Sequence, residues 1–137
     1  KALITPPCRN KRFLGQAQVT TERYRQASER LLVQARAELA AGDLPQASEK
    51  GWGAAVRMLK AIAEQRGWEH HRHRHHHRAA NRLRSETGDA DIRRFFNSAS
   101  ALHENFYEDD MEPDMVAESL DDVEALLAKL TPLLTQV

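Results

Sequence analysis

The chain is poor in cysteine and has no long apolar stretch. Cys8 is the only cysteine in 137 residues, which excludes an internal disulfide bond and a zinc site built from several thiolates. No apolar run approaches the ~20 residues that a membrane-spanning helix needs, so we expect no membrane segment. The first residues also lack the pattern of a secretory signal. A reducing, cytoplasmic setting is therefore the default expectation.

The residues that are present fit one folded domain. Apolar residues make up 41% of the sequence and charged residues 29%, as in an ordinary globular protein. Residues 1–18 contain two prolines and show no helical period, and we expect them to form a flexible arm. Residues 19–137 are long enough to bury a core and are assigned to a single domain.

Apolar residues recur at intervals of three and four through most of this domain, which is the period of an amphipathic helix. The predicted helices cover about residues 21–41, 43–66, 69–87, 90–107 and 113 to near the C-terminus, and the first half of the third could be a loop. No alternating strand pattern competes with them. The predicted fold is all-α, an antiparallel up-and-down bundle of four to five helices.

Capping residues mark the boundaries of the second predicted helix. Asp43 precedes it as an N-cap, and Gln46 follows three residues later, as in a capping box. Gly67 is expected to end it in the left-handed conformation. Inside the helix, Gly51 and Gly53 flank Trp52. Because glycine weakens a helix interior, we expect close approach of another helix there.

The net charge of zero conceals two charged segments. Residues 104–124, the acidic segment, contain ten acidic residues and no lysine or arginine. Residues 66–84, the basic segment, contain six arginines, six histidines and one acid, Glu69. We expect a basic pole and an acidic pole unless the two segments pack together.

Two stretches resemble the HEPN superfamily, and within it the PaREP-type branch of small prokaryotic helical proteins. They are "ELAAGDLPQASEKGWGAAVRMLKAIAEQRGWEH" and, from Leu102 to Glu108, "LHENFYE". The resemblance implies a HEPN-like helical bundle. It also implies a homodimer and, by analogy with toxin-type members, an antitoxin-type protein partner.

Many HEPN proteins are ribonucleases, and those that cut RNA carry an arginine, four to six residues, and then a histidine in a late helix. The resemblance therefore implies His103 as a catalytic residue, with Arg94 or Arg93. Here eight or nine residues separate them. The alternative is that His103 is a packed side chain, with Glu49 and Lys50 as candidate polar partners.

The histidines of the basic segment suggest a metal site. On a helix, His71 with His75 and His73 with His77 would each place two imidazoles on one face. Two imidazoles bind a divalent metal weakly, so we favour adventitious uptake over a physiological metal site, and no cofactor is expected.

The arginines of the basic segment suggest contact with phosphate groups, and the candidates are Arg72, Arg74, Arg78 and Arg82. The leading hypothesis is a binding module for RNA or a nucleotide at this segment. The alternatives are a metal-independent endoribonuclease and a structural bundle for protein interaction or dimerisation. The plainest interpretation of the segment is a solvated, exposed connection.

Overall fold

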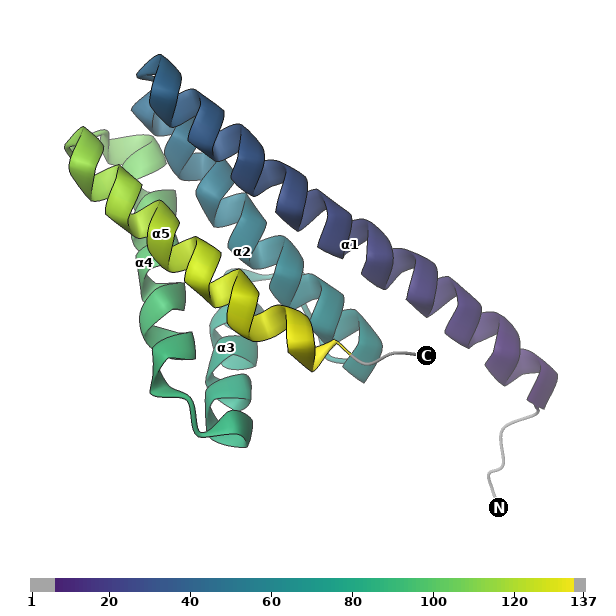
Figure 1. Ribbon diagram of the computed structural model, residues 1–137. Helices are drawn as coiled ribbons and strands as arrows, with labels where there is room; N and C mark the ends of the chain where they lie inside the picture. Colours follow the sequence, from purple (N-terminus) through teal and green to yellow (C-terminus); the bar gives the residue numbers. More distant parts are fainter. Residues whose placement is uncertain (1–6, 135–137) are drawn as a thin grey trace.

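The protein consists of helices joined by short turns (Figure 1). The computed structural model describes residues 7–134. The elements are α1 (Pro7–Ala41), α2 (Leu44–Arg66), α3 (His73–Thr87), α4 (Ala90–Glu108), α5 (Pro113–Leu130) and a short 3₁₀ turn, η1 (Thr131–Leu133). No strand occurs within this range, which confirms the predicted all-α class.

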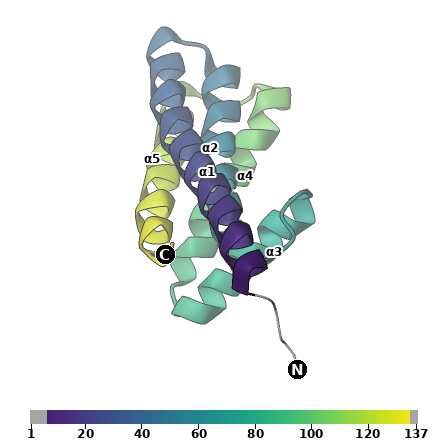
Figure 2. The ribbon, with the colours of Figure 1, turned by 90° about the vertical axis from the view of Figure 1, so that its right-hand side faces the viewer.

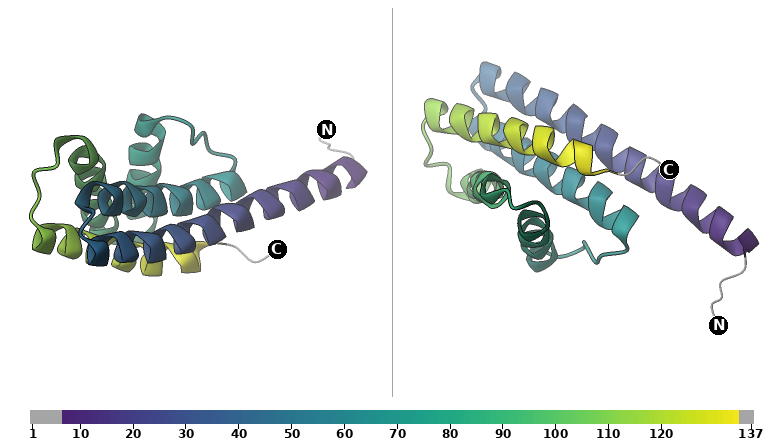
Figure 3. Two further views of the ribbon diagram at one scale, coloured as in Figure 1. Left: turned by 90° about the horizontal axis from the view of Figure 1, so that it is seen from above. Right: turned by 60° about the horizontal axis from the view of Figure 1, so that its bottom comes forward.

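The helices pack around α2. α1 and α2 form an antiparallel hairpin, α5 lies alongside them, and α4 crosses them at a marked angle (Figures 1 and 3). α3 is short and lies at the end of the molecule opposite the α1–α2 and α4–α5 turns (Figure 2). α3 packs chiefly on α4 and α2. Over the described residues, no helix is long and apolar enough to cross a membrane.

The start of α1 differs from the prediction. The helix begins at Pro7 rather than near Thr21, so residues 7–18, which we expected to belong to the arm, are helical. Proline is well tolerated in a first helical turn. This part of α1 extends past the other helices (Figure 3). A segment outside the core needs no apolar stripe, which explains why no helical period marked it. Residues 1–6 of the predicted arm lie outside the described range.

The predicted boundaries of α2 are confirmed. The side chain of Asp43 accepts a hydrogen bond of 3.1 Å from the backbone N–H of Gln46. At the other end Gly67 has φ +71°. The N–H groups of Gly67 and Trp68 donate to the carbonyls of Glu64 and Ala63, at 3.4 and 2.9 Å. This is the Schellman arrangement, and it turns Trp68 back along the helix.

Gly51 lies where α4 and α5 meet α2, as its position beside Trp52 suggested. A Cβ atom at Gly51 would lie 2.5 Å from Cδ2 of Leu120 and 3.0 Å from Cδ1 of Leu102. Both leucines are fully buried. The missing side chain therefore allows α4 and α5 to pack closely on α2, and this offsets the cost of glycine in a helix.

The two charged segments are carried mainly by different helices. α3 carries most of the basic segment, and the acidic segment runs from the end of α4 through α5 (Figure 1). Part of the acidic segment is neutralised by α1, because Arg36 pairs with Asp121 and Glu124 at 2.9 and 2.6 Å. The two segments therefore do not neutralise each other.

Candidate functional site

Residues 67–72 connect α2 to α3 and are held to both helices through His70. The carbonyl oxygen of His70 accepts hydrogen bonds from Nζ of Lys60 at 2.7 Å and from Nε2 of His76 at 2.9 Å. The His70 ring lies 3.0 Å from a carboxylate oxygen of Glu64 through Nε2. Lys60 and Glu64 are both on α2, so this helix fixes the path of the connection.

The histidine-rich stretch is not simply a solvated turn, and this expectation is corrected for three of its members. His70, His75 and His76 are only 6%, 8% and 6% exposed. Burial lowers the pKa of His76 to about 4, and the positive charge of Lys60 acts in the same direction. Its Nδ1 atom is buried and has no hydrogen-bond partner among the described residues. These imidazoles therefore contribute to the interior of the α2–α3 connection.

His75 fixes the first turn of α3. Its Nδ1 accepts a hydrogen bond of 3.3 Å from the backbone N–H of Arg72, and its Nε2 lies 3.0 Å from a carboxylate oxygen of Glu69. Both ring nitrogens are therefore occupied. His75 thus pairs with Glu69 beside the helix start, although the Glu69 side chain is largely exposed.

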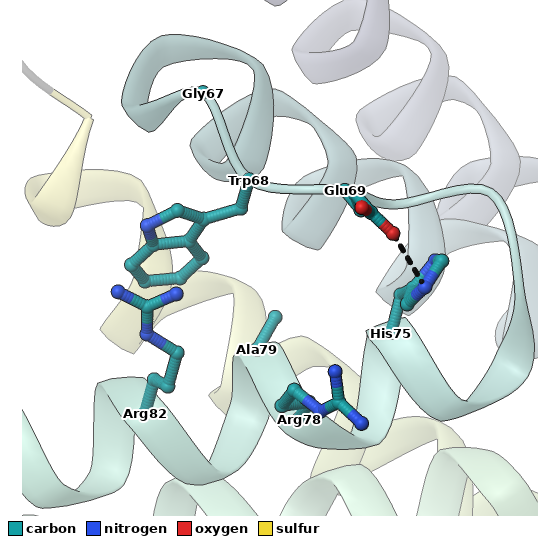
Figure 4. A pocket seen from close by; sticks show the side chains of 7 residues that line it. All are labelled: Gly67, Trp68, Glu69, His75, Arg78, Ala79 and Arg82. Atoms are coloured by element: carbon teal, nitrogen blue, oxygen red, sulfur yellow. Dashed lines mark ion pairs between the residues drawn. The ribbon is translucent and has the colours of Figure 1, made fainter.

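A pocket of about 270 Å³ lies between this connection and α3 (Figure 4). It is lined by Gly67, Trp68, Glu69, His75, Arg78, Ala79 and Arg82. The guanidinium of Arg82 lies over the Trp68 ring, 3.9 Å from its centroid. That contact is a cation–π interaction, which restricts the orientation of Arg82. Arg66 also approaches the Trp68 ring, at 5.2 Å, but is paired with Glu86.

Three of the four arginines predicted to contact phosphate form a row on α3. Arg74, Arg78 and Arg82 recur every four residues and are all exposed. The rise of an α-helix separates successive members by about 6 Å along the axis. None of them pairs with an acid in residues 7–134, where the ion pairs of the basic segment involve Arg66, His70 and His75. Arg72, the fourth, is the exposed N-cap residue of α3.

The four predicted metal-binding histidines do not all lie on one helix, as the prediction assumed. His71 precedes α3, so the spacing argument for His71 with His75 does not apply, and His75 is occupied by Glu69 and Arg72. His73 and His77 are both on α3 and exposed. Within the described part of the chain, no group of three or more His, Cys, Asp or Glu side chains could hold a metal ion.

His103 lies in a separate cluster between α2, α3 and α4. Its Nδ1 is 3.0 Å from Oε1 of Glu49, one of the two partners predicted for it. Its ring stacks on Trp52 with centroids 4.9 Å apart and meets the edge of His73, also at 4.9 Å. The side chain is 22% exposed. His103 is therefore an oriented imidazole at the surface, neither buried nor free.

Arg93 and Arg94 lie far from His103 along α4. All three are on α4, where nine or ten residues correspond to about 13–15 Å along the axis. Arg94 is paired with Asp91 at 3.0 Å and is largely exposed. Arg93 is exposed and lies near His77, whose pKa is lowered first by partial burial of its ring and then by the charges of His73 and Arg93. Neither arginine contacts His103 within the described chain, and their role beside it stays a prediction.

Two residues of this region were not predicted from the sequence. Trp68 lines the pocket and supports Arg82, and Lys60 holds the α2–α3 connection through the carbonyl of His70. One signal was available for Trp68. It directly follows Gly67, and the residue after such a glycine commonly packs back on its helix. No comparable signal marks Lys60, because its contact with His70 depends on how the chain returns after α2.

The fold and the α2–α3 surface together define a small all-helical protein with an arginine row on its shortest α-helix. The sequence profile of the archaeal PaREP1/PaREP8 family matches residues 23–127, and the chain belongs to this family. The PaREP-type part of the resemblance is thereby confirmed.

A solved structure supports the fold. The crystal structure of a protein from Sulfolobus solfataricus is similar to this chain with a TM-score of 0.71 and 24% sequence identity. The similarity covers 80% of this chain and 97% of that one. No curated protein matches the sequence.

Proposed function

We propose that the protein is an RNA-binding module that contacts the phosphate backbone through the arginine row of α3. The observation that supports this most directly is the exposure of Arg74, Arg78 and Arg82 along one helix side without acidic partners in the described chain. Guanidinium groups donate paired hydrogen bonds to phosphate oxygens. The choice of RNA follows the resemblance to HEPN proteins.

Two further features favour this surface over the rest of the molecule. Most of the acidic segment lies on the α4–α5 turn and on α5, which packs chiefly on α4, α2 and α1 rather than on α3, so few of its charges adjoin the arginine row. The clamp on His70 and the stacking of Arg82 on Trp68 hold the surface in place before a ligand arrives, which reduces the entropy lost on binding.

The proposal is tested by fluorescence anisotropy with a labelled single-stranded RNA at several salt concentrations. Three phosphate contacts predict a slope of about −2 for the logarithm of the binding constant against the logarithm of salt concentration. Arg74→Gln with Arg78→Gln should weaken binding at least tenfold and make the slope shallower. The matched control, Arg23→Gln with Arg30→Gln, removes the same charge from exposed positions on α1. Equal affinities for the two double variants, or no salt-sensitive binding, would refute the proposal.

A second candidate is a metal-independent endoribonuclease, which the geometry of His103 favours. Glu49 orients its Nδ1, which leaves Nε2 to act as a general base toward a ribose 2′-hydroxyl, and His73 lies beside it as a second imidazole. Attack of the 2′-oxygen on phosphorus would then give a 2′,3′-cyclic phosphate and a free 5′-hydroxyl. Cleavage in excess chelator that is lost in His103→Gln, but not in Arg94→Gln, would support this candidate. Intact RNA after prolonged incubation would exclude it.

The third hypothesis is an interaction or dimerisation bundle. Among the side chains that the structure describes, the exposed large apolar residues are Val19, Val33, Tyr107 and Met115, which come from three helices. Homodimerisation and an antitoxin-type partner stay predictions. Light scattering on the purified chain tests the first of them directly.

A further inference from the structure

The pocket beside the arginine row differs from the row itself in shape and in charge. Arg74 lies outside it, whereas Arg78 and Arg82 line it together with Trp68 (Figure 4). The row can contact successive phosphates of an RNA strand that runs along the helix. The pocket instead offers a concave space lined by the side chains of Arg78 and Arg82, and this favours a compact group with two negative charges.

Of the charged residues around the pocket, Glu69 and Arg66 form ion pairs, whereas Arg78 and Arg82 do not. Glu69 is held by His75 at 3.0 Å, and Arg66 by Glu86 at 2.5 Å. The guanidinium of Arg82 rests on the Trp68 ring. No acidic side chain among the described residues pairs with it. Arg78 likewise has no acidic partner there. The net positive charge of the pocket therefore comes from Arg78 and Arg82.

We infer that this pocket binds a phosphomonoester, and specifically the terminal phosphate of the RNA strand that the row of α3 contacts. A terminal monoester carries close to two negative charges at neutral pH, whereas an internal phosphodiester carries one. A volume of about 270 Å³ accommodates a phosphate group with part of its nucleoside. This inference rests on the proposed function, because the same helix supplies the contacts to the rest of the strand.

The test compares one RNA sequence in three forms, with a 5′-phosphate, with a 3′-phosphate and with hydroxyls at both ends. A mononucleotide, AMP, and inorganic phosphate serve as separate competitors and distinguish a strand end from a free monoester. We expect one phosphorylated form to bind at least tenfold more tightly than the hydroxyl form. AMP should compete only at much higher concentration, since it lacks the contacts to Arg74.

Single substitutions distinguish the contribution of the pocket to RNA binding from that of the arginine row. Arg78→Gln should abolish the preference for the phosphorylated end, whereas Arg74→Gln should weaken all three RNA forms by the same factor and retain the preference. Arg30→Gln on α1 controls for net charge. Circular dichroism checks that each variant keeps its helical content.

The outcomes distinguish the two proposals. Tight binding of all three RNA forms without preference would overturn the pocket inference and leave the proposed function intact. If no RNA binds, the proposed function is wrong. Direct binding of AMP then tests whether the pocket binds a phosphomonoester. Binding of AMP that Arg78→Gln abolishes would retain a monoester pocket, and absence of AMP binding would overturn it.

Discussion

Asn105 on α4 donates a hydrogen bond of 2.9 Å from Nδ2 to Oγ of Ser48 on α2, and both side chains are buried. The Oδ1 atom of the same amide accepts from the backbone N–H groups of Asp110 and Met111, each at 2.9 Å. One side chain therefore joins the core to the α4–α5 turn. The turn itself places Asp109 in the left-handed region, with φ +49°.

Replacing this amide should destabilise the fold. Asn105→Ala leaves Ser48 and two backbone N–H groups without their partners, and we expect a loss of about 2–4 kcal/mol in the free energy of unfolding. Urea denaturation followed by circular dichroism measures it. Asn97→Ala, at an exposed position of the same helix, should change the value by less than about 0.5 kcal/mol. Equal effects of the two substitutions would contradict the role assigned to Asn105.

A side chain at Gly51 should also be costly. The new methyl of Gly51→Ala would meet Leu120 and Leu102, so these buried side chains or the helices that carry them must shift, at an expected cost of about 1–3 kcal/mol. Gly15→Ala is the matched control, because no atom lies within 4 Å of the position that its new methyl would occupy and alanine favours a helix. The prediction fails if both variants unfold at the same urea concentration as the parent.

Stability should fall on acidification because of His76. Its pKa is lowered to about 4 in the folded protein, from an ordinary value of 6.5, so the unfolded chain binds the proton more readily between these values. The stabilising contribution is present above pH 6.5 and is lost as the pH falls toward 4. Between pH 7 and pH 5 we expect this group to remove about 2 kcal/mol.

Denaturation at the two pH values, combined with an NMR titration of the imidazole, checks this prediction. The groups facing His76 are Lys60, His70 and His73, and Lys60 keeps its charge throughout the range. A His76 that titrates near 6.5 in the folded protein would show the prediction to be wrong. In His76→Gln, the loss of stability between pH 7 and pH 5 should be smaller by about the same 2 kcal/mol.

Removing the acid at the pocket should strengthen anion binding. Glu69→Gln keeps the shape of the side chain but removes a negative charge beside Arg78 and Arg82. Since Glu69 is largely exposed, we expect a gain of only about two- to fivefold in affinity for phosphorylated RNA. Anisotropy titrations measure the change. Glu118→Gln, at an exposed position of α5 in the acidic segment, should leave the affinity within twofold.

The helix boundaries at Asp43 and Gly67 could be predicted from the sequence, because each capping residue contacts only its neighbours in the chain. Asp43 accepts from a backbone N–H three residues away, and Gly67 adopts a conformation that few other residues tolerate. The predicted contact of His103 with Glu49 is also present, although these residues are on different helices. The helical part of residues 7–18 was missed because a segment outside the core carries no apolar period.

The sequence by itself therefore determined the fold class, most helix boundaries and the segregation of basic from acidic residues, since each depends on neighbours in the chain. Only the tertiary structure decided which histidines are buried and which arginines share a pocket. His70 and His76 leave solvent because Lys60 and a backbone carbonyl lie within hydrogen-bonding distance in the folded chain. Arg82 is held because Gly67 turns Trp68 toward it. Those contacts follow from the angle at which α3 returns to α2, and no spacing along the sequence encodes that angle.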